Sequence, residues 1–316
     1  MQRRHALEAL AFGTAISGAA FAQSERRDTT SPRNTSPSQA DAPFIVARDG
    51  TRLFWREWGR GRPILFLSSL ALPSNMWDYQ LMAFASHGFR CIAFDRRGHG
   101  RSDIPPGGYD YDTLADDVSV IIEALDLRDL TLVSHSMAGG EIIRYLSRHG
   151  SSRVGRIVLL ATTTPFLLKT DENPNGVAKE ALDSLWAGWR KDYPQWVAEN
   201  VDPFFVPETP RAIKAWMVNL VTQITVPVAV ACSQALAFAD FRDEMESIVT
   251  PALVIHGDRD ASAPLALTGK PSAALIPHCL LKIYEGAPHG LMYTHADRLH
   301  ADMLRFISDT TAVPNS

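Results

Sequence analysis

The sequence has few cysteines, no excess of positive charge and none of the common nucleotide or metal motifs, and each shortage excludes a class of protein. Its three cysteines, Cys91, Cys232 and Cys279, form no C-x-x-C pair, so neither a zinc ribbon nor a redox dithiol is expected. The formal net charge is -4, which provides no basic surface for nucleic acid. Because G-x-x-x-x-G-K-[ST], G-x-G-x-x-G and H-E-x-x-H are all missing, the sequence predicts no nucleotide, no metal and no other cofactor.

Hydrophobic runs are also short, and after the N-terminus none is long enough to predict a membrane span. The opening stretch, MQRRHALEALAFGTAISGAAFAQS, places Arg3 and Arg4 before a weakly apolar run that ends in an A-x-A site. This pattern predicts a twin-arginine-like export signal over residues 1–22 and a periplasmic or secreted protein; the alternative is a short amphipathic helix. Residues 23–43 are mostly Ser, Thr, Pro and charged residues, which is typical of a disordered linker. We expect no disulfide.

The rest of the chain alternates buried strands with amphipathic helices, which is the pattern of an α/β domain with a mostly parallel sheet. We expect this domain over residues 44–312, with eight strands and helices on both faces of the sheet. It begins with a hairpin around Asp49 and Gly50. Further strands are predicted at 63–68, 90–95, 129–135, 153–161, 250–258 and 279–286. Helices are predicted at 76–88, 111–127, 137–150 and 295–308, and a broken helix at 263–275.

Residues 162–249 contain no clear buried strand, and we expect them to form a helical cap inserted after the sixth strand. Large aromatic residues stand in this segment, among them Trp186, Trp189, Trp196, Phe204, Phe205 and Trp216. Most of them are expected in the core. A few that face a pocket would make that pocket apolar.

The stretch DLTLVSHSMAGGEIIRYLSRHG places Ser136 where a predicted strand meets a predicted helix. A nucleophile there must lie on a sharp turn that lifts its Oγ above the sheet. The usual G-x-S-x-G pattern is missing, since Ser134 and Ala138 replace the glycines. Both are small, however, and small side chains are what the crossing of strand and helix requires. Together with Gly139 and Gly140, which keep the first helical turn thin, they favour a nucleophile elbow.

A serine nucleophile needs a base, and the base needs an acid that orients it. In this class of fold the chain order is Ser, acid, His. VIHGDRD and EGAPHG follow the last two predicted strands, so His289 is the candidate base. Asp258 and Asp260 are both candidates for the acid, and Asp260 is favoured because it lies further into the loop. Other histidines, among them His256, are expected to lie at the ends of structural elements.

Two backbone N–H groups are predicted to bind the oxyanion that forms during acyl transfer. One belongs to Met137, in the first turn after the nucleophile. The other comes from the loop SSLALPSNMW, where Leu70 is the candidate donor and Ser69 the alternative. The stretch DRRGHGRS is expected to form a tight turn near that loop, with Arg97 paired to a carboxylate.

TLVSHSMAGGEIIRYLSRHG, RIVLLATTTPFLLKTDENPNG, ALVIHGDRD and LKIYEGAPHGLMYTH together resemble the cofactor-free haloperoxidases, perhydrolases and aryl esterases of the α/β-hydrolase superfamily. The resemblance runs from about residue 44 to 310 and includes DRRGHGRS. It implies the α/β-hydrolase fold, the triad Ser136, Asp260 and His289, and oxyanion donors at Leu70 and Met137. It also implies that no cofactor is needed, and that copies of the chain self-associate.

The loop after the third strand departs from this group, because Ser68-Ser69-Leu70-Ala71 stands where H-G-[WF]-P is usual. The proline of that motif favours peroxide chemistry, so Ala71 argues mildly against it. The loop looks more like that of 3-oxoadipate enol-lactonases. The predicted function is therefore hydrolysis of a small ester or lactone through an acyl-enzyme, with water or hydrogen peroxide as the second reactant. The alternatives are peracid formation as the main activity and a non-catalytic binding protein.

Overall fold

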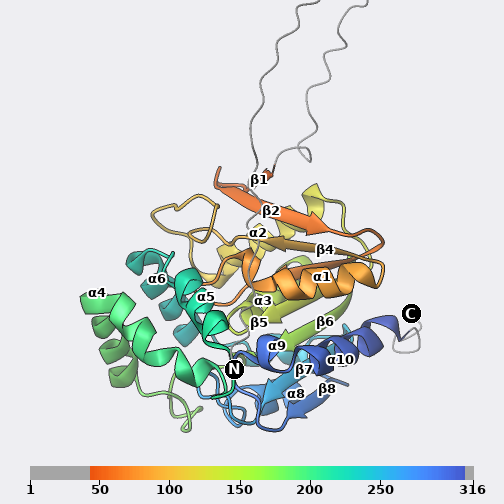
Figure 1. The fold of residues 1–316 in the computed structure, drawn as a ribbon. Helices are drawn as coiled ribbons and strands as arrows, with labels where there is room; N and C mark the ends of the chain where they lie inside the picture. The colour runs from red at the N-terminus through yellow and green to blue at the C-terminus, as the bar shows by residue number, and fades with distance from the viewer. Residues whose placement is uncertain (1–42, 310–316) are drawn as a thin grey trace, which may run out of the picture. The chain divides into compact units, whose positions relative to one another are not determined.

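An eight-stranded, mostly parallel sheet forms the centre of the computed structural model, which describes residues 43–309 (Figure 1). The strand order is β1-β2-β4-β3-β5-β6-β7-β8; β2 runs antiparallel to its two neighbours, and the six strands from β3 to β8 run parallel to one another. The strands are β1 Phe44–Val46, β2 Arg52–Trp58, β3 Arg62–Leu67, β4 Phe89–Phe94, β5 Leu130–His135, β6 Val154–Leu160, β7 Ala252–Gly257 and β8 Leu280–Tyr284. The α/β fold expected from the alternating pattern is confirmed.

Helices cover both faces of this sheet, and short 3-10 turns connect some of them. The elements are η1 Ser74–Trp77, α1 Asp78–Ser86, α2 Tyr111–Ala124, α3 Ala138–His149, α4 Lys179–Asn200, η2 Asp202–Phe204, α5 Arg211–Val221, α6 Val226–Phe238, α7 Arg242–Glu246, α8 Gly269–Leu275, α9 Leu291–Thr294 and α10 Ala296–Ser308. Among the described residues, no single helix is long and apolar enough to cross a membrane; the pair α5 and α6, bent by 94°, passes that test only as a pair.

The central strands are apolar on both faces because each face packs against its own layer of helices. Leu65 and Leu67 of β3 belong to a core with α2 and α3, whereas Ile64 and Phe66 belong to a core with α1 and α10. The alternation follows the two-residue period of a strand. The continuous apolar runs in the sequence are therefore strands buried on both sides.

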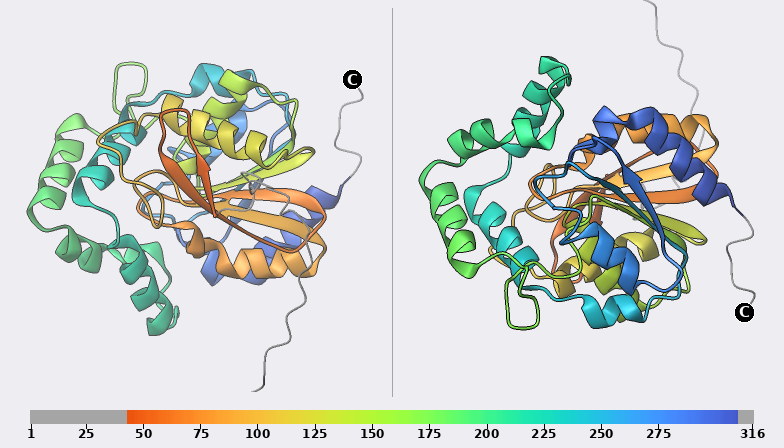
Figure 2. Two further views of the ribbon diagram at one scale, coloured as in Figure 1. Left: turned by 90° about the horizontal axis from the view of Figure 1, so that it is seen from above. Right: turned by 90° about the horizontal axis from the view of Figure 1, so that it is seen from below.

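The segment between β6 and β7 is helical and contributes α4, α5, α6 and α7. In all the views of Figures 1 and 2, α4, α5 and α6 lie to one side of the sheet. Helix α4 is kinked, with non-helical dihedral angles at Asp192 just before Pro194. Pro194 has no N–H to continue the helical hydrogen bonds, and a proline ring inside a helix clashes with the carbonyl four residues earlier, so we attribute the kink to Pro194.

Two predicted helices differ from the structure. The helix expected at 76–88 begins as the 3-10 turn η1 and becomes α-helical only at Asp78. The broken helix expected at 263–275 is α-helical only over α8, and residues 261–268 form bends and turns. The predicted signal and linker, residues 1–22 and 23–43, lie outside the described residues except for Pro43.

Candidate active site

Ser136 lies at the sharp turn between β5 and α3. Its φ is +58°, a left-handed value that non-glycine residues rarely adopt. Its backbone N–H donates to the carbonyl of Leu160 on β6, at 3.0 Å, and its carbonyl accepts from Gly139 at 3.1 Å. These bonds on both sides hold the strained turn, as expected where local strain serves a functional site.

The residues around Ser136 are small because the turn is crowded. Ser134 and Ala138 are completely buried. A Cβ on Gly139 would lie 2.2 Å from Thr162 Oγ1, and one on Gly140 would lie 2.5 Å from the ring of Phe241. The first turn of α3 therefore needs both glycines, although neither occupies a glycine position of G-x-S-x-G.

Asp260 and His289 are brought together from the loops after β7 and β8. His289 Nδ1 lies 2.7 Å from Asp260 Oδ2, and the other carboxylate oxygen accepts from the N–H groups of Ser262 and Ala263. Burial by itself would raise the pKa of the Asp260 carboxyl, but the charge of His289 and hydrogen bonds from His256 and His289 hold that pKa well below its ordinary value. An ionised Asp260 accepts a hydrogen bond from the Nδ1–H of His289, and this tautomer leaves Nε2 unprotonated and able to act as a base.

Asp258, the other candidate acid, does not contact His289. Its Oδ1 accepts from the N–H of Gly286 at 2.7 Å. Asp258 thereby joins the loop after β7 to the loop that carries His289, which is a structural contact.

Two further histidines support this pair, and sequence reasoning did not assign them to the site. His256 Nε2 lies 2.7 Å from the carbonyl of Ala263 and 3.2 Å from Asp260 Oδ2. His135 Nε2 lies 3.0 Å from the carbonyl of His289, and burial keeps the pKa of His135 well below its ordinary value. Only their positions in the sequence could have indicated that these histidines belong to the site: His256 is four residues before Asp260, and His135 is next to Ser136.

The loop after β3 leaves one backbone donor available beside Ser136. The N–H of Ser69 donates to Met76 Sδ at 3.4 Å, and that of Ala71 to His99 Nε2 at 3.2 Å. For Leu70 and Met137, no hydrogen bond from the N–H to another described residue is present. Of the two candidate loop donors, Leu70 is therefore the one whose N–H remains available.

Ser136 and His289 line one cavity of about 340 Å³. Most of its wall comes from the helical segment after β6, including Leu182, Trp189, Tyr193, Trp196, Val218 and Leu236. No Asp, Glu, Lys or Arg is among the described residues that line it. The cavity therefore suits an uncharged, apolar group next to the serine.

The six aromatic residues named above divide between this wall and the rest of the structure, and more of them face the cavity than the sequence led us to expect. Trp189, Trp196 and Phe204 line the cavity, and Trp186 and Phe205 are buried elsewhere. Within residues 43–309, no group of three or more His, Cys, Asp or Glu side chains could hold a metal ion.

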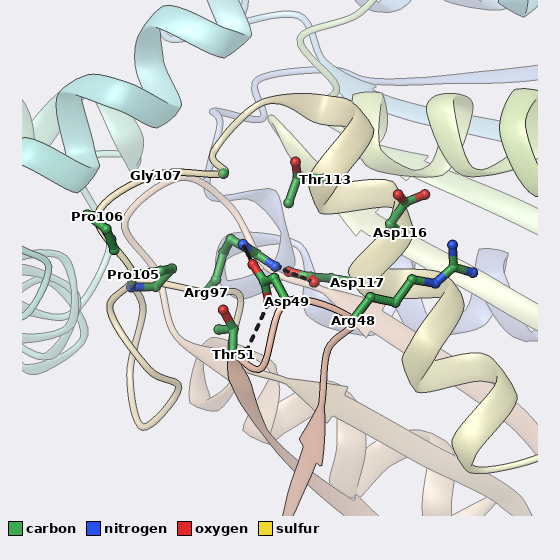
Figure 3. Close-up of a pocket in the computed structure, with 11 residues that line it drawn as sticks. Arg48, Asp49, Thr51, Arg97, Pro105, Pro106, Gly107, Thr113, Asp116 and Asp117 are labelled. Carbon is green, nitrogen blue, oxygen red and sulfur yellow. Dashed lines mark hydrogen bonds and ion pairs between the residues drawn. The ribbon is translucent and has the colours of Figure 1, made fainter.

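A second cavity, of about 520 Å³, is lined by Arg97 together with Asp49 and Asp117 among others (Figure 3). Arg97 is buried and donates from Nε and Nη2 to Asp117 and from Nη1 to Asp49, at 2.6 to 2.7 Å. The expected pairing of Arg97 with a carboxylate is confirmed. With its donors engaged, this guanidinium is part of the fold and not a site for an anion.

A parallel sheet of this strand order, with a serine after β5, an aspartate after β7 and a histidine after β8, defines the class of α/β hydrolases. The family model described as "alpha/beta hydrolase fold" matches residues 62–296. A non-heme chloroperoxidase of Kitasatospora aureofaciens is 38% identical over 273 residues, 84% of this chain and 99% of the relative. A bifunctional esterase/perhydrolase of Acinetobacter calcoaceticus is 34% identical over 276 residues, again 84% of this chain and 99% of the relative.

Solved structures agree with this assignment. An esterase from Exiguobacterium antarcticum superposes with a TM-score of 0.81 at 30% identity, over 84% of this chain and 99% of that one. The chain belongs to the α/β-hydrolase family, in its group of non-heme haloperoxidases, perhydrolases and esterases. The resemblance seen in the sequence motifs is confirmed.

Proposed function

We propose that the protein is a serine hydrolase of carboxylic esters or lactones. The observation that carries the proposal is that Ser136, on a strained strand–helix turn, shares an apolar cavity with His289, whose Nδ1 is hydrogen-bonded to the buried carboxylate of Asp260. The names of the relatives, an esterase/perhydrolase and an esterase among them, support the same class of reaction.

The mechanism follows from the positions of these groups. His289 Nε2 takes the proton of Ser136 Oγ while that oxygen attacks the carbonyl carbon of the ester. The tetrahedral oxyanion accepts hydrogen bonds from the N–H groups of Leu70 and Met137. His289 then returns the proton to the leaving alcohol, and the acyl group stays on Ser136. Water, deprotonated by His289, attacks the acyl-enzyme and releases the carboxylic acid.

Replacing Ser136 tests the proposal, and the chain offers a matched control in Ser134. Hydrolysis of p-nitrophenyl acetate and of a small lactone should fall by at least about 10⁴-fold in Ser136→Ala. Ser134→Ala removes a hydroxyl that is buried without a hydrogen-bond partner among the described residues, so its activity should stay within a few fold of the wild type. Equal rates in Ser136→Ala and the wild type would exclude the serine mechanism.

A second reaction, perhydrolysis, is favoured by the names of the relatives. Hydrogen peroxide would replace water in the attack on the acyl-enzyme and release a peracid, which oxidises halide in solution. We propose it as a side activity. Adding acetate, peroxide and bromide and following bromination of a phenolic dye measures it, and bromination that outpaces ester hydrolysis would make it the main activity instead.

We also propose that residues 1–22 export the protein, because they contain a twin arginine followed by an A-x-A site. From the family resemblance described above, we propose in addition that copies of the protein self-associate. Replacing Arg3 and Arg4 by Lys should leave a precursor with an intact N-terminus in the cytoplasm. Processing that is unaffected would contradict export by this route. Sedimentation velocity of the purified mature chain measures its oligomeric state.

A further inference from the structure

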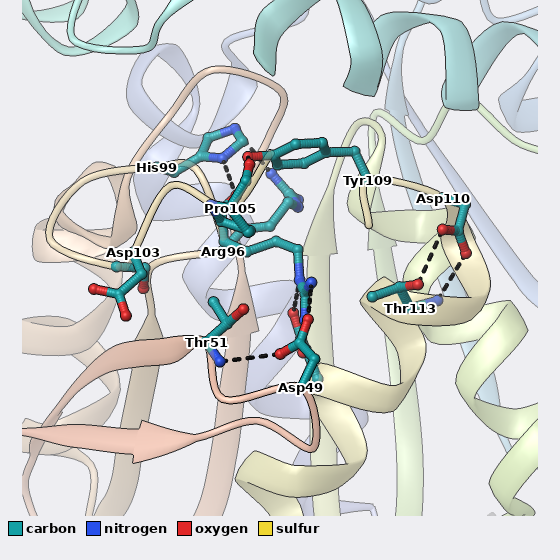
Figure 4. Close-up of polar contacts among 12 residues, drawn as sticks. Asp49, Thr51, Arg96, His99, Asp103, Pro105, Tyr109, Asp110 and Thr113 are labelled. Carbon is teal, nitrogen blue, oxygen red and sulfur yellow. Dashed lines mark hydrogen bonds and ion pairs between the residues drawn. The ribbon is translucent and has the colours of Figure 1, made fainter. Parts of the chain in front are cut away.

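The side chain of Arg96, in the DRRGHGRS turn, binds the oxyanion loop, residues 68–71. Figure 4 shows Arg96 and His99 of this turn. Arg96 is 2% exposed. Its Nη1 donates to the carbonyl of Ser69 at 3.1 Å, and its Nη2 to the carbonyl of Ser68 at 2.5 Å. A single guanidinium thus binds two consecutive carbonyl groups of the loop.

One of these bonds acts directly on the candidate oxyanion donor. The carbonyl of Ser69 and the N–H of Leu70 belong to the same planar trans peptide, so they point in opposite directions. A cation that holds the Ser69 oxygen on one side therefore fixes the Leu70 N–H on the other. It also polarises the peptide and makes that N–H a stronger donor.

The next peptide of the loop is held as well. The N–H of Ala71 donates to His99 Nε2, and His99 Nδ1 lies 3.0 Å from the carbonyl of Arg97. This arrangement requires His99 to be neutral, with its proton on Nδ1. Arg96 and His99 lie beside one another, with Arg96 Nη1 3.4 Å from His99 Nε2. The peptides on both sides of Leu70 are therefore fixed by the same turn.

Arg96 is in turn joined to the helix that carries the second donor. Its Nε donates to Glu141 Oε1 at 2.6 Å, and Nη2 forms an ion pair with the same carboxylate. Glu141 is 1% exposed and lies on the first turns of α3, the helix that begins directly after Met137. Because the pair is buried away from water, each charge is compensated mainly by the other, and removing only one of them would leave an unpaired buried charge.

We propose that Arg96 and Glu141 are a positioning pair that sets the Leu70 N–H against the Met137 N–H, so that both point at the developing oxyanion. The inference rests on the proposed serine mechanism. Neither residue lines the cavity, and neither touches the substrate. Their contribution is confined to the tetrahedral intermediate, which is where the oxyanion exists.

The neighbouring residue provides a matched control. Arg97 is also buried and also paired with a buried carboxylate, that of Asp117, but it contacts no residue of the oxyanion loop through its side chain. The double variants Arg96→Met/Glu141→Leu and Arg97→Met/Asp117→Leu each remove one buried ion pair and leave no buried charge unpaired. The second also takes the Arg97 partner from Asp49, but the Asp49 side chain is 49% exposed and can be solvated by water. A purely structural role would affect both in the same way.

The test compares these two double variants in turnover and in the binding of phenylboronic acid, which forms a tetrahedral adduct with an activated serine. In Arg96→Met/Glu141→Leu, we expect kcat for p-nitrophenyl acetate to fall by about 10²-fold, with KM changed by less than about threefold. Affinity for phenylboronic acid should weaken in parallel. In Arg97→Met/Asp117→Leu, both quantities should stay close to those of the wild type.

A third variant, Arg96→Lys, covers the case in which the first double variant does not fold. Lysine keeps the charge but cannot bind two carbonyls and Glu141 in the same fork, so its kcat should lie between that of the wild type and the double variant. A kcat equal to wild type in Arg96→Lys, or equal losses in the two double variants, would overturn the positioning role. Failure of the serine mechanism itself is recognised separately, by activity that survives Ser136→Ala.

Discussion

Ala71 has a backbone conformation that proline cannot adopt, although the related group carries proline at this point of the loop. Its φ is +63°, and its N–H donates to His99. Proline fixes φ near −65° and has no N–H. The loop of this protein is therefore built differently from a loop with H-G-[WF]-P, and peroxide chemistry here cannot depend on that proline.

Ala71→Pro should for this reason impair the protein and not convert it into a better perhydrolase. We expect a loss of more than about 1 kcal/mol in the free energy of unfolding, because His99 loses its donor and the backbone must change. Ester hydrolysis should fall with it. Urea unfolding and turnover with water and with peroxide measure both effects.

Ala71→Gly is the control, since glycine keeps the N–H and readily takes a positive φ. It should keep esterase activity. A gain of peracid formation in Ala71→Pro, with stability unchanged, would contradict this account of the loop.

The candidate reacting groups could be predicted from the sequence because each follows a strand in a fixed chain order. Ser136, Asp260 and His289 stand after the fifth, seventh and eighth strands. The residues that hold them could not be predicted, because their partners are distant in the chain. Arg96 contacts Glu141 from 45 residues away, and His135 contacts His289 from 154 residues away. No periodicity or local motif encodes such pairs.

At the scale of single elements, the first turn of α3 depends on tight packing. A Cβ on Gly140 would lie 2.5 Å from Phe241 and 2.6 Å from Tyr111, and the hydroxyl of Tyr111 donates to the carbonyl of Met137. Gly140→Ala should therefore lower the free energy of unfolding by about 1–3 kcal/mol. It should also lower kcat, because Tyr111 is displaced from the peptide next to the serine.

Gly188, within α4, is the matched control for this substitution. A Cβ there has no atom within 4 Å, so alanine should be neutral or raise stability by up to about 1 kcal/mol. Urea unfolding of both variants checks the contrast. Two variants with the same stability would show that crowding at α3 is not what requires glycine.

The limits of sequence reasoning at this scale appear at the ends of helices. Strands predicted from apolar runs agree with the structure to within about two residues, as 63–68 does with β3 Arg62–Leu67. The segment 263–275, predicted as a broken helix, is α-helical only from Gly269 onward, and Pro264 in its first half has no N–H to donate. The short helix α9, Leu291–Thr294, was not predicted, since four residues carry too little periodicity.

At the scale of the whole molecule, two buried neutral histidines make stability depend on pH. Burial, followed by the charge of Arg96, lowers the pKa of His99 to about 3, and burial lowers that of His135 well below its ordinary value. In the unfolded chain each histidine titrates near its ordinary pKa of about 6.5. Between these values the unfolded state binds the proton and the folded state does not.

The stabilisation from these neutral histidines is therefore fully present above about pH 6.5 and is lost as the pH falls toward the folded pKa values. Each histidine contributes a slope of up to about 1.4 kcal/mol per pH unit. We expect His99→Gln to remove one of these contributions, so its unfolding free energy should change less between pH 6.5 and pH 5. Urea unfolding at these pH values measures the slopes, and identical slopes in variant and wild type would contradict the prediction.

The part of the chain that forms the cavity wall has a consequence for how the sequence of this protein can evolve. The candidate reacting groups come from the ends of β5, β7 and β8, whereas most of the wall comes from the stretch between β6 and β7. Substitutions in that stretch alter the shape offered to a substrate and leave the strand ends as they are. The chemistry and the choice of substrate are thus inherited on separate pieces of sequence, and selection can revise one without the other.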